Sequence, residues 1–317
     1  MNNSVSDSNY NMADTALNDI AQKKANVVQS LNTSNSAKEY VKEQLDEFGI
    51  MMCGSARVGK STLINALCKR ELAGKSPHLN AFTQAVTKYP LHVTYQDEKG
   101  RESVATVNFW DTPGIENWNE ESVKFYVLEL VDKTKPICMI YCASPGSLAN
   151  LKTIKWICDA CAGSKIFFAL VCTNMFAGTK AQRDGILDDF KEILANVAGN
   201  VQTTKYENIH LSSKIGLVAA VNSEHFDNGD GYIRSETGVN ELCMTIMEQL
   251  DEEKLKGWCI TLLDNRDFWT KMSHDLQGFF KEKFPVFLRS ARGFINEMWT
   301  TTFKIVSEIT EITKAFK

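Results

Sequence analysis

The sequence lacks the features that define several protein classes. Among its 317 residues, no apolar run reaches the roughly 18 residues that a membrane-spanning helix needs. The first residues show no basic-then-apolar signal pattern and do not begin Met-Gly, and the last three, Ala-Phe-Lys, carry no prenylation cysteine. The net charge of −4 gives no electrostatic reason to expect a nucleic-acid partner. We therefore expect a cytoplasmic protein that binds no nucleic acid.

Cysteine is not scarce, but its pattern argues against a disulfide framework. The nine cysteines are odd in number and lie mostly in apolar runs such as ICMIYC and ALVC, which indicates reduced, buried thiols. Cys158 and Cys161 form a single CxxC, with no second pair and no nearby histidine. A zinc or redox site is the alternative to two core cysteines on a helix, and the isolation of the motif favours the core.

The sequence does contain a regular alternation of short apolar segments and helical segments. The strands alternate with helices and are often entirely apolar, which predicts an α/β fold with a mostly parallel sheet covered on both faces. The predicted strands are residues 48–53, 87–95, 103–110, 136–143, 165–172 and 207–212, and the predicted helices are residues 61–72, 121–133, 148–161, 181–197 and 238–254.

We expect three parts along the chain. Residues 1–44 form an N-terminal extension, with a disordered start and a short amphipathic helix, and a second helix runs over residues 37–48. Residues 45–255 form the α/β domain. Residues 256–317 form an amphipathic helical extension with Phe and Ile at spacings of mostly three and four. From residue 254 onward eleven Lys and Arg stand against seven Asp and Glu, so this extension packs on the domain, self-associates or lies on a membrane surface.

A complete phosphate-binding loop follows the first predicted strand. Its residues match GxxxxGKS and open the helix of residues 61–72, which is the context that the motif needs. The glycines let backbone N–H groups curl round phosphates, Lys60 neutralises the β and γ oxygens, and the Ser61 hydroxyl binds Mg²⁺. The residues expected to hold the nucleotide here are Gly54, Ser55, Ala56, Arg57, Val58, Gly59, Lys60, Ser61 and Thr62.

A second phosphate-side motif, DTPG, comes directly off the strand of residues 103–110. Asp111 at a strand end can hold the Mg²⁺ shell through water, and the Gly114 N–H can meet the γ-phosphate. Asp-x-x-Gly alone is a turn signature. Behind a phosphate-binding loop it indicates a nucleotide site.

The order GKSTLINAL, strand, DTPG resembles the translation-factor-related class of GTPases, with similarity to its Era-like, dynamin-like and immunity-associated (GIMAP-type) members. The resemblance covers about residues 45–255 and implies a three-layer domain with a six-stranded sheet in which one strand is antiparallel. It implies GTP or GDP and Mg²⁺ as ligands. It also implies a switch threonine that completes the Mg²⁺ shell, for which Thr83 and Thr87 compete; we favour Thr83 because of its distance from Lys60.

Two positions bear on hydrolysis. Ile115 follows DTPG, where Ras-like enzymes have a glutamine that orients the attacking water. Arg57 makes the loop GxxRxGKS, similar to guanylate-binding proteins, in which such an arginine reaches the transferring phosphate upon dimerisation. The alternative is that Arg57 projects into water. We count Lys60, Arg57 and Thr83 as the candidate catalytic residues.

The base end of the site is less complete. The turn Ser212-Ser213-Lys214 resembles the loop whose backbone contacts guanine O6 in this class. The class also expects [N/T]-K-x-D after the fifth strand, and this chain has Thr173-Asn174-Met175-Phe176. We expect Thr173 and Asn174 to face the base, although no register recovers the carboxylate that reads guanine.

These features support two hypotheses from different classes. The first is a GTPase that hydrolyses GTP with Mg²⁺, slowly as a monomer and faster as a homodimer formed through the nucleotide face or the C-terminal helices. The alternative is a nucleotide-binding interaction module with little hydrolysis and relaxed base specificity. An adenine-specific ATPase or kinase ranks last. Peripheral membrane contact through the C-terminal extension stays open.

Overall fold

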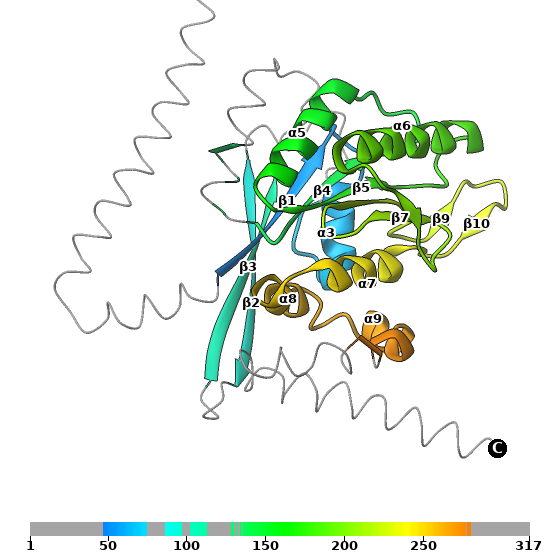
Figure 1. Ribbon diagram of the computed structural model, residues 1–317. Helices are drawn as coiled ribbons and strands as arrows, with labels where there is room; N and C mark the ends of the chain where they lie inside the picture. Colours follow the sequence, from blue (N-terminus) through cyan, green and yellow to red (C-terminus); the bar gives the residue numbers. More distant parts are fainter. Residues whose placement is uncertain are drawn as a thin grey trace, which may run out of the picture. The chain divides into compact units, whose positions relative to one another are not determined.

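The computed structural model (Figure 1) describes residues 47–74, 86–96, 102–112, 128–129, 131, 134, 136–276 and 278–279. Its main sheet has eight strands in the order β2-β3-β1-β4-β5-β8-β7-β6, and β9 and β10 form a separate two-stranded hairpin. The strands are β1 Glu47–Gly54, β2 Thr87–Gln96, β3 Glu102–Asp111, β4 Cys138–Ala143, β5 Phe167–Cys172, β6 Gln202–Thr203, β7 Ile209–Ser212, β8 Gly216–Ala220, β9 Phe226–Asp227 and β10 Ile233–Arg234.

Helices cover both faces of the sheet. Figure 1 shows α5 and α6 on one face and α3, α7 and α8 on the other. The helices are α3 Lys60–Cys68, α5 Leu151–Gly163, α6 Lys180–Ala198, α7 Val239–Gln249, α8 Glu252–Thr261 and α9 Arg266–Lys271. This is the three-layer α/β arrangement that the alternation of strands and helices predicts.

The central strands are apolar because both of their faces are buried. β1 lies between β3 and β4, and the pairings β3–β1, β1–β4, β4–β5 and β5–β8 are all parallel. Successive side chains point to opposite faces, so Met52 packs with α3 and α7 whereas Met51 packs with α5 and α6. The carboxyl ends of β1, β3, β4, β5 and β8 therefore meet at one edge of the sheet.

The predicted α/β class and mostly parallel sheet are confirmed. Six strands, β2, β3, β1, β4, β5 and β8, form the expected sheet with one antiparallel strand, and β7 and β6 extend it by antiparallel pairing. β8 lies in a segment for which no strand was predicted. The helix predicted over residues 61–72 ends at Cys68 because Lys69 adopts a left-handed conformation with φ 50°.

Other predicted elements lie partly or wholly outside the described residues. Glu47 and Phe48 lie in β1 and not in the helix predicted over 37–48, while the rest of that helix and the extension 1–44 lie outside the described residues. So does most of the helix predicted over 121–133, although residues 128, 129 and 131 are helical.

The hydrophobic core continues past the predicted domain boundary at residue 255. Trp258, Phe268 and Leu276 are buried in the same cluster as Leu63 and Leu67 of α3. Packing therefore assigns the residues up to 279 to the α/β domain. The remainder of the predicted extension, residues 280–317, lies outside the described residues.

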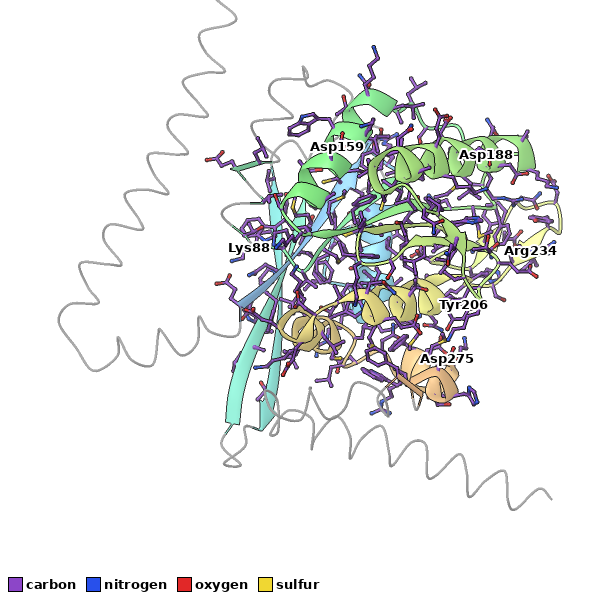
Figure 2. The ribbon with its side chains drawn as sticks, in the orientation of Figure 1. Lys88, Asp159, Asp188, Tyr206, Arg234 and Asp275 are labelled. Atoms are coloured by element: carbon purple, nitrogen blue, oxygen red, sulfur yellow. The ribbon has the colours of Figure 1, made fainter. Side chains whose placement is uncertain are left out.

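A polar cluster also fastens this C-terminal part to the sheet. The Tyr206 hydroxyl, before β7, donates to Asp275 Oδ2 at 2.5 Å, and Lys205 Nζ lies 2.8 Å from Asp275 Oδ1. Figure 2 labels Tyr206 above Asp275, which lies in the orange part of the chain next to α9. Burial would raise the pKa of Asp275, but the hydrogen bonds from Lys205 and Tyr206 outweigh it, so its pKa is lowered.

All nine cysteines are free thiols with buried side chains. Cys158 and Cys161 lie on α5 against the sheet, and burial raises the pKa of both thiols well above the ordinary value. Within the part of the chain that the structure describes, no group of three or more His, Cys, Asp or Glu side chains could hold a metal ion. No helix there is long and apolar enough to cross a membrane.

Candidate functional site

The phosphate-binding loop is the turn that joins β1 to α3. Gly54 has φ +133°, and a Cβ there would lie 2.1 Å from the carbonyl oxygen of Cys142 on the adjacent strand β4. Gly59 has φ +90°, and the intervening Arg57 is left-handed with φ 63°. The two glycines are therefore required by backbone geometry, which curls the chain around the start of α3.

Lys60 and Asp111 converge at this turn. Lys60 is 6% exposed, and its Nζ donates to the carbonyl oxygens of Gly54 at 3.2 Å and Ser55 at 2.9 Å. The same Nζ lies 3.9 Å from Oδ1 of Asp111, which is 1% exposed at the end of β3. A buried cation and a buried carboxylate thus face the inside of the loop, where opposite charges stabilise each other more strongly than in water.

The other loop residues divide between the protein interior and the surface. The Ser55 hydroxyl donates to the carbonyl oxygen of Leu148 at 2.8 Å, which ties the loop to the segment after β4. Val58 is buried and Arg57 is exposed. The partly exposed residues, which can face a ligand, are Ala56, Gly59, Ser61 and Thr62.

The two switch candidates fall in different parts of the chain. Thr87 is the first residue of β2 and pairs in register with Asp111, so the two residues lie side by side on adjacent strands. Thr83 and Gly114 lie outside the described residues. Tyr89, two residues along β2, has its pKa raised by burial and then by the negative charge of Asp111.

The loop after β5 is fastened to the phosphate-binding loop. The Thr173 hydroxyl is within hydrogen-bond reach of the carbonyl oxygens of Val58 and of Ala143, the latter at 2.9 Å, and its single proton is donated to one of them at a time. Asn174 has φ 47°. Its amide lies against Gly59, because a Cβ on that glycine would be 3.2 Å from Nδ2 of Asn174. Thr173 and Asn174 therefore lie beside the phosphate-binding loop, and their predicted contact with the base stays a prediction.

The next two residues point elsewhere. Met175 is 7% exposed, and its N–H donates to the carbonyl oxygen of Val221 at 3.2 Å. The ring of Phe176 lies 6.4 Å from the rings of both Phe226 and Tyr232. The loop thus supplies a hydrophobic side chain where a carboxylate was expected.

Comparison with known families agrees with this geometry. Residues 49–158, about a third of the chain, match the family model described as 50S ribosome-binding GTPase. This part of the chain is a P-loop GTPase domain. The matched segment contains the phosphate-binding loop and Asp111, and it ends within α5.

Several solved structures resemble the GTPase domain at low identity. Toc33 from Arabidopsis thaliana, in complex with GDP and Mg²⁺, is 15% identical with a TM-score of 0.39, over 71% of this chain and 88% of that chain. The elongation factor SelB from Methanococcus maripaludis, with the GTP analogue GppNHp, is 12% identical with a TM-score of 0.39, over 64% of this chain and 34% of that chain. TM-scores below 0.5 support no conclusion about mechanism. No curated protein matches the sequence.

The turn Ser212-Ser213-Lys214 is not at the nucleotide end of the GTPase domain, so its predicted contact with the base is wrong. The turn joins β7 to β8, and Gly216 at the start of β8 pairs with Phe168 at the start of β5. It therefore lies at the amino ends of the parallel strands, opposite the phosphate-binding loop. Lys214 Nζ instead donates to the carbonyl oxygen of Gln249 at 3.0 Å, at the end of α7.

The loop that occupies the expected place follows β8. The Val221 N–H donates to the carbonyl oxygen of Cys172 at 2.8 Å, next to Thr173. Asn222 and Ser223 follow and are 4% and 5% exposed. The apolar run GLVAAV that ends in Asn-Ser is the signal that could have located this loop, because it has the form of the other buried strands.

Proposed function

We propose that the chain binds a guanine nucleotide with Mg²⁺ at the loop Gly54–Ser61 and hydrolyses GTP to GDP and phosphate. The observation that carries the proposal is the convergence of Lys60 and Asp111, 3.9 Å apart, at the carboxyl edge of a parallel sheet. Ligands of open α/β sheets bind outside the carboxyl ends of the strands. Backbone N–H groups at the start of α3 add the positive end of a helix to this site.

The residues present fit a magnesium ion. Mg²⁺ prefers hard oxygen donors, one or two from the protein and the rest from phosphate and water. The Ser61 hydroxyl opens α3, and the Asp111 carboxylate lies buried beside Lys60. These two side chains would hold the ion, which would neutralise charge that develops on the phosphate oxygens.

Thr83 remains our first candidate for the switch threonine, and Thr87 is the alternative. Thr87 pairs in register with Asp111, which supports the alternative because it needs no rearrangement to approach the carboxylate. Alanine replacement of each residue, read out as the Mg²⁺ dependence of nucleotide affinity, separates the two. The switch residue is the one whose variant loses affinity for a GTP analogue but keeps its affinity for GDP.

Hydrolysis by a single copy is expected to be slow. Ile115 has no group that could orient water, so the missing contribution has to come from elsewhere. Arg57 is exposed on the phosphate-binding loop, and an arginine that reaches the transferring phosphate accelerates such reactions by about 10³ to 10⁵. We propose that pairing of two copies across the nucleotide face directs Arg57 to the phosphate.

A second candidate function is a nucleotide-binding module with little turnover, acting in the cytoplasm through partners or at a membrane surface. The presence of Phe176 where a base-reading carboxylate was expected favours it. Both candidates need the same phosphate site, and they differ in whether phosphate is released.

Equilibrium binding with Mg²⁺ is the first test. A fluorescent GTP analogue is titrated with the full chain, with Lys60→Ala, and with Lys152→Ala as a control that removes an exposed lysine from α5. Binding should be lost in Lys60→Ala and kept in Lys152→Ala, because only the Lys60 ammonium lies at the phosphate-binding loop. The rate of phosphate release then distinguishes the two candidate functions. A rate that rises with protein concentration supports the dimerising GTPase. Equal binding by all three proteins refutes the proposed site.

A further inference from the structure

The β9–β10 hairpin builds a second wall beside the loop after β5. Four side chains form this wall: Phe176 from that loop, Phe226 from β9, Tyr232 from the position just before β10, and Arg234 from the end of β10. The ring centroids of Phe226 and Tyr232 are 6.1 Å apart, and both lie 6.4 Å from that of Phe176. We call these four residues the aromatic wall. Its Phe176 stands two residues beyond the Asn174 amide that touches Gly59.

The topology places the aromatic wall on the base side of the site. The hairpin follows β8 along the chain. At the base of the hairpin Asn222 forms a β-bridge with Thr237, and the Asn222 N–H donates to the Thr237 carbonyl oxygen at 2.8 Å. Asp111 ends β3, on one side of β1, whereas β4, β5 and β8 lie on the other side. A nucleotide whose terminal phosphate points to Asp111 must therefore direct its base toward the ends of β5 and β8, where the wall stands.

Arg234 supplies the hydrogen-bonding chemistry of the aromatic wall. Its Cζ lies 4.0 Å from the ring centroid of Tyr232 and 6.0 Å from that of Phe176. One Nη1 proton goes to the carbonyl oxygen of Ile233 at 2.8 Å, and no carboxylate among the described residues pairs with the guanidinium. A guanidinium has five N–H donors and no acceptor, so donors remain for a ligand. Figure 2 labels Arg234 on the hairpin, at its outer side.

We propose that Arg234 recognises the base by donating to its C6 oxygen and N7, so that the site selects 6-oxopurine nucleotides without reading the 2-amino group. This inference rests on the proposed nucleotide site. Arginine binds the O6 and N7 acceptors of guanine through two parallel hydrogen bonds. Hypoxanthine and xanthine present the same two acceptors. Adenine instead presents an amino group at C6, which sets a donor against a donor.

The loop that reads the 2-amino group in related enzymes has no acceptor of the necessary kind here. Residues 173–176 contain no carboxylate. On the hairpin, the Asp227 carboxylate accepts the N–H of Gly229 at 2.8 Å, and Glu236 pairs with Lys69 at 2.7 Å. Glu224, between Ser223 and the hairpin, and Asp230, in the hairpin turn, are the carboxylates that the experiment must exclude.

The test uses competition by GTP, ITP, XTP and ATP against a fluorescent guanine nucleotide bound to the full chain with Mg²⁺. GTP and ITP should bind within about threefold of each other, since they differ only in the 2-amino group. ATP should bind more weakly by about 5- to 150-fold, the range that one good bidentate base contact provides. Arg234→Ala should reduce the GTP-to-ATP ratio toward one, and Arg234→Lys should restore part of it. Arg266→Ala, an exposed arginine on α9, should leave the ratio unchanged.

Two results overturn this inference alone. The first is GTP binding at least about tenfold tighter than ITP, a preference that a carboxylate reader produces; its loss in Glu224→Gln would identify that reader. The second is a GTP-to-ATP ratio that survives in Arg234→Ala. Binding that is absent, or that is insensitive to Lys60→Ala, instead refutes the proposed function, and the inference falls with it.

Discussion

Replacing Asn265 by alanine tests whether the segment after residue 255 is part of the GTPase domain. Asn265 is 0% exposed and lies between α8 and α9. Its Oδ1 accepts the N–H of Phe268 at 3.1 Å and so caps α9. Its Nδ2 donates to the carbonyl oxygens of Leu67 at 3.1 Å and Ala66 at 3.4 Å. Those carbonyls belong to the last turn of α3, where no intrahelical donor exists.

The expected loss of stability in Asn265→Ala combines two effects. Removing a helix N-cap costs about 1 kcal/mol, and leaving a buried carbonyl without a donor costs about 1–3 kcal/mol. We expect Asn265→Ala to lower the free energy of unfolding by about 2–4 kcal/mol, or roughly 5–15 °C in Tm for a domain of this size. Asn150→Ala is the matched control, because Asn150 caps the exposed start of α5 and, among the residues that the structure describes, donates to no buried carbonyl. Its loss should be about 1 kcal/mol.

Asn265→Asp separates the cap from the donor. The carboxyl keeps an oxygen for Phe268 but faces the carbonyl oxygens of α3, so burial and the lost donor raise its pKa in the folded state. A raised folded-state pKa means that the penalty is absent below the unfolded value and complete above the folded value. Urea unfolding should therefore show a loss that grows as pH rises from 4 to 8. Equal losses in Asn265→Ala and Asn150→Ala would refute the account.

Two further predictions concern the base loop and the Asp275 cluster. Thr173→Val should weaken nucleotide binding by roughly fivefold, since it removes one buried hydroxyl bond worth about 1 kcal/mol between the loops, and it should lower the free energy of unfolding by a similar amount; unchanged affinity in the same competition assay would contradict it. Stability should fall as pH drops below about 4, because the pKa of Asp275 is lowered in the folded state, so its contribution is present above the unfolded value and lost as the carboxylate protonates. Acid titration of unfolding should show a smaller fall in Lys205→Ala and Tyr206→Phe, and an undiminished fall in both variants would exclude Asp275 as its source.

The central strands could be predicted because a strand that is buried on both faces needs apolar residues at nearly every position. β4 and β5, CMIYCA and FFALVC, are buried at every position, and such runs bounded by turns have no other stable place than the middle of a parallel sheet. The phosphate-binding loop was predictable for a different reason. Gly54 and Gly59 adopt positive φ angles, which glycine adopts readily because it has no Cβ, so the residue type itself indicates the turn.

The sequence left three roles open for the C-terminal segment because periodicity shows that a helix has an apolar stripe but not what covers the stripe. Leu276 belongs to the predicted stripe and is buried against the domain. The decisive contacts, Asn265 to the end of α3 and Tyr206 to Asp275, join residues 198 and 69 positions apart. Single-sequence patterns carry no information about pairs at that separation.

The error at Ser212-Ser213-Lys214 has a more specific cause. A loop motif identifies a ligand contact only if the preceding strand runs toward the ligand, and strand direction is a property of pairing. β7 pairs antiparallel with β8, so its end lies at the edge of the sheet away from Lys60. Gly216–Ala220 turns the chain back, and only then do Asn222 and Ser223 reach the nucleotide end. The base-reading residues of this domain therefore have to be sought after β8, where the hairpin that carries Arg234 begins.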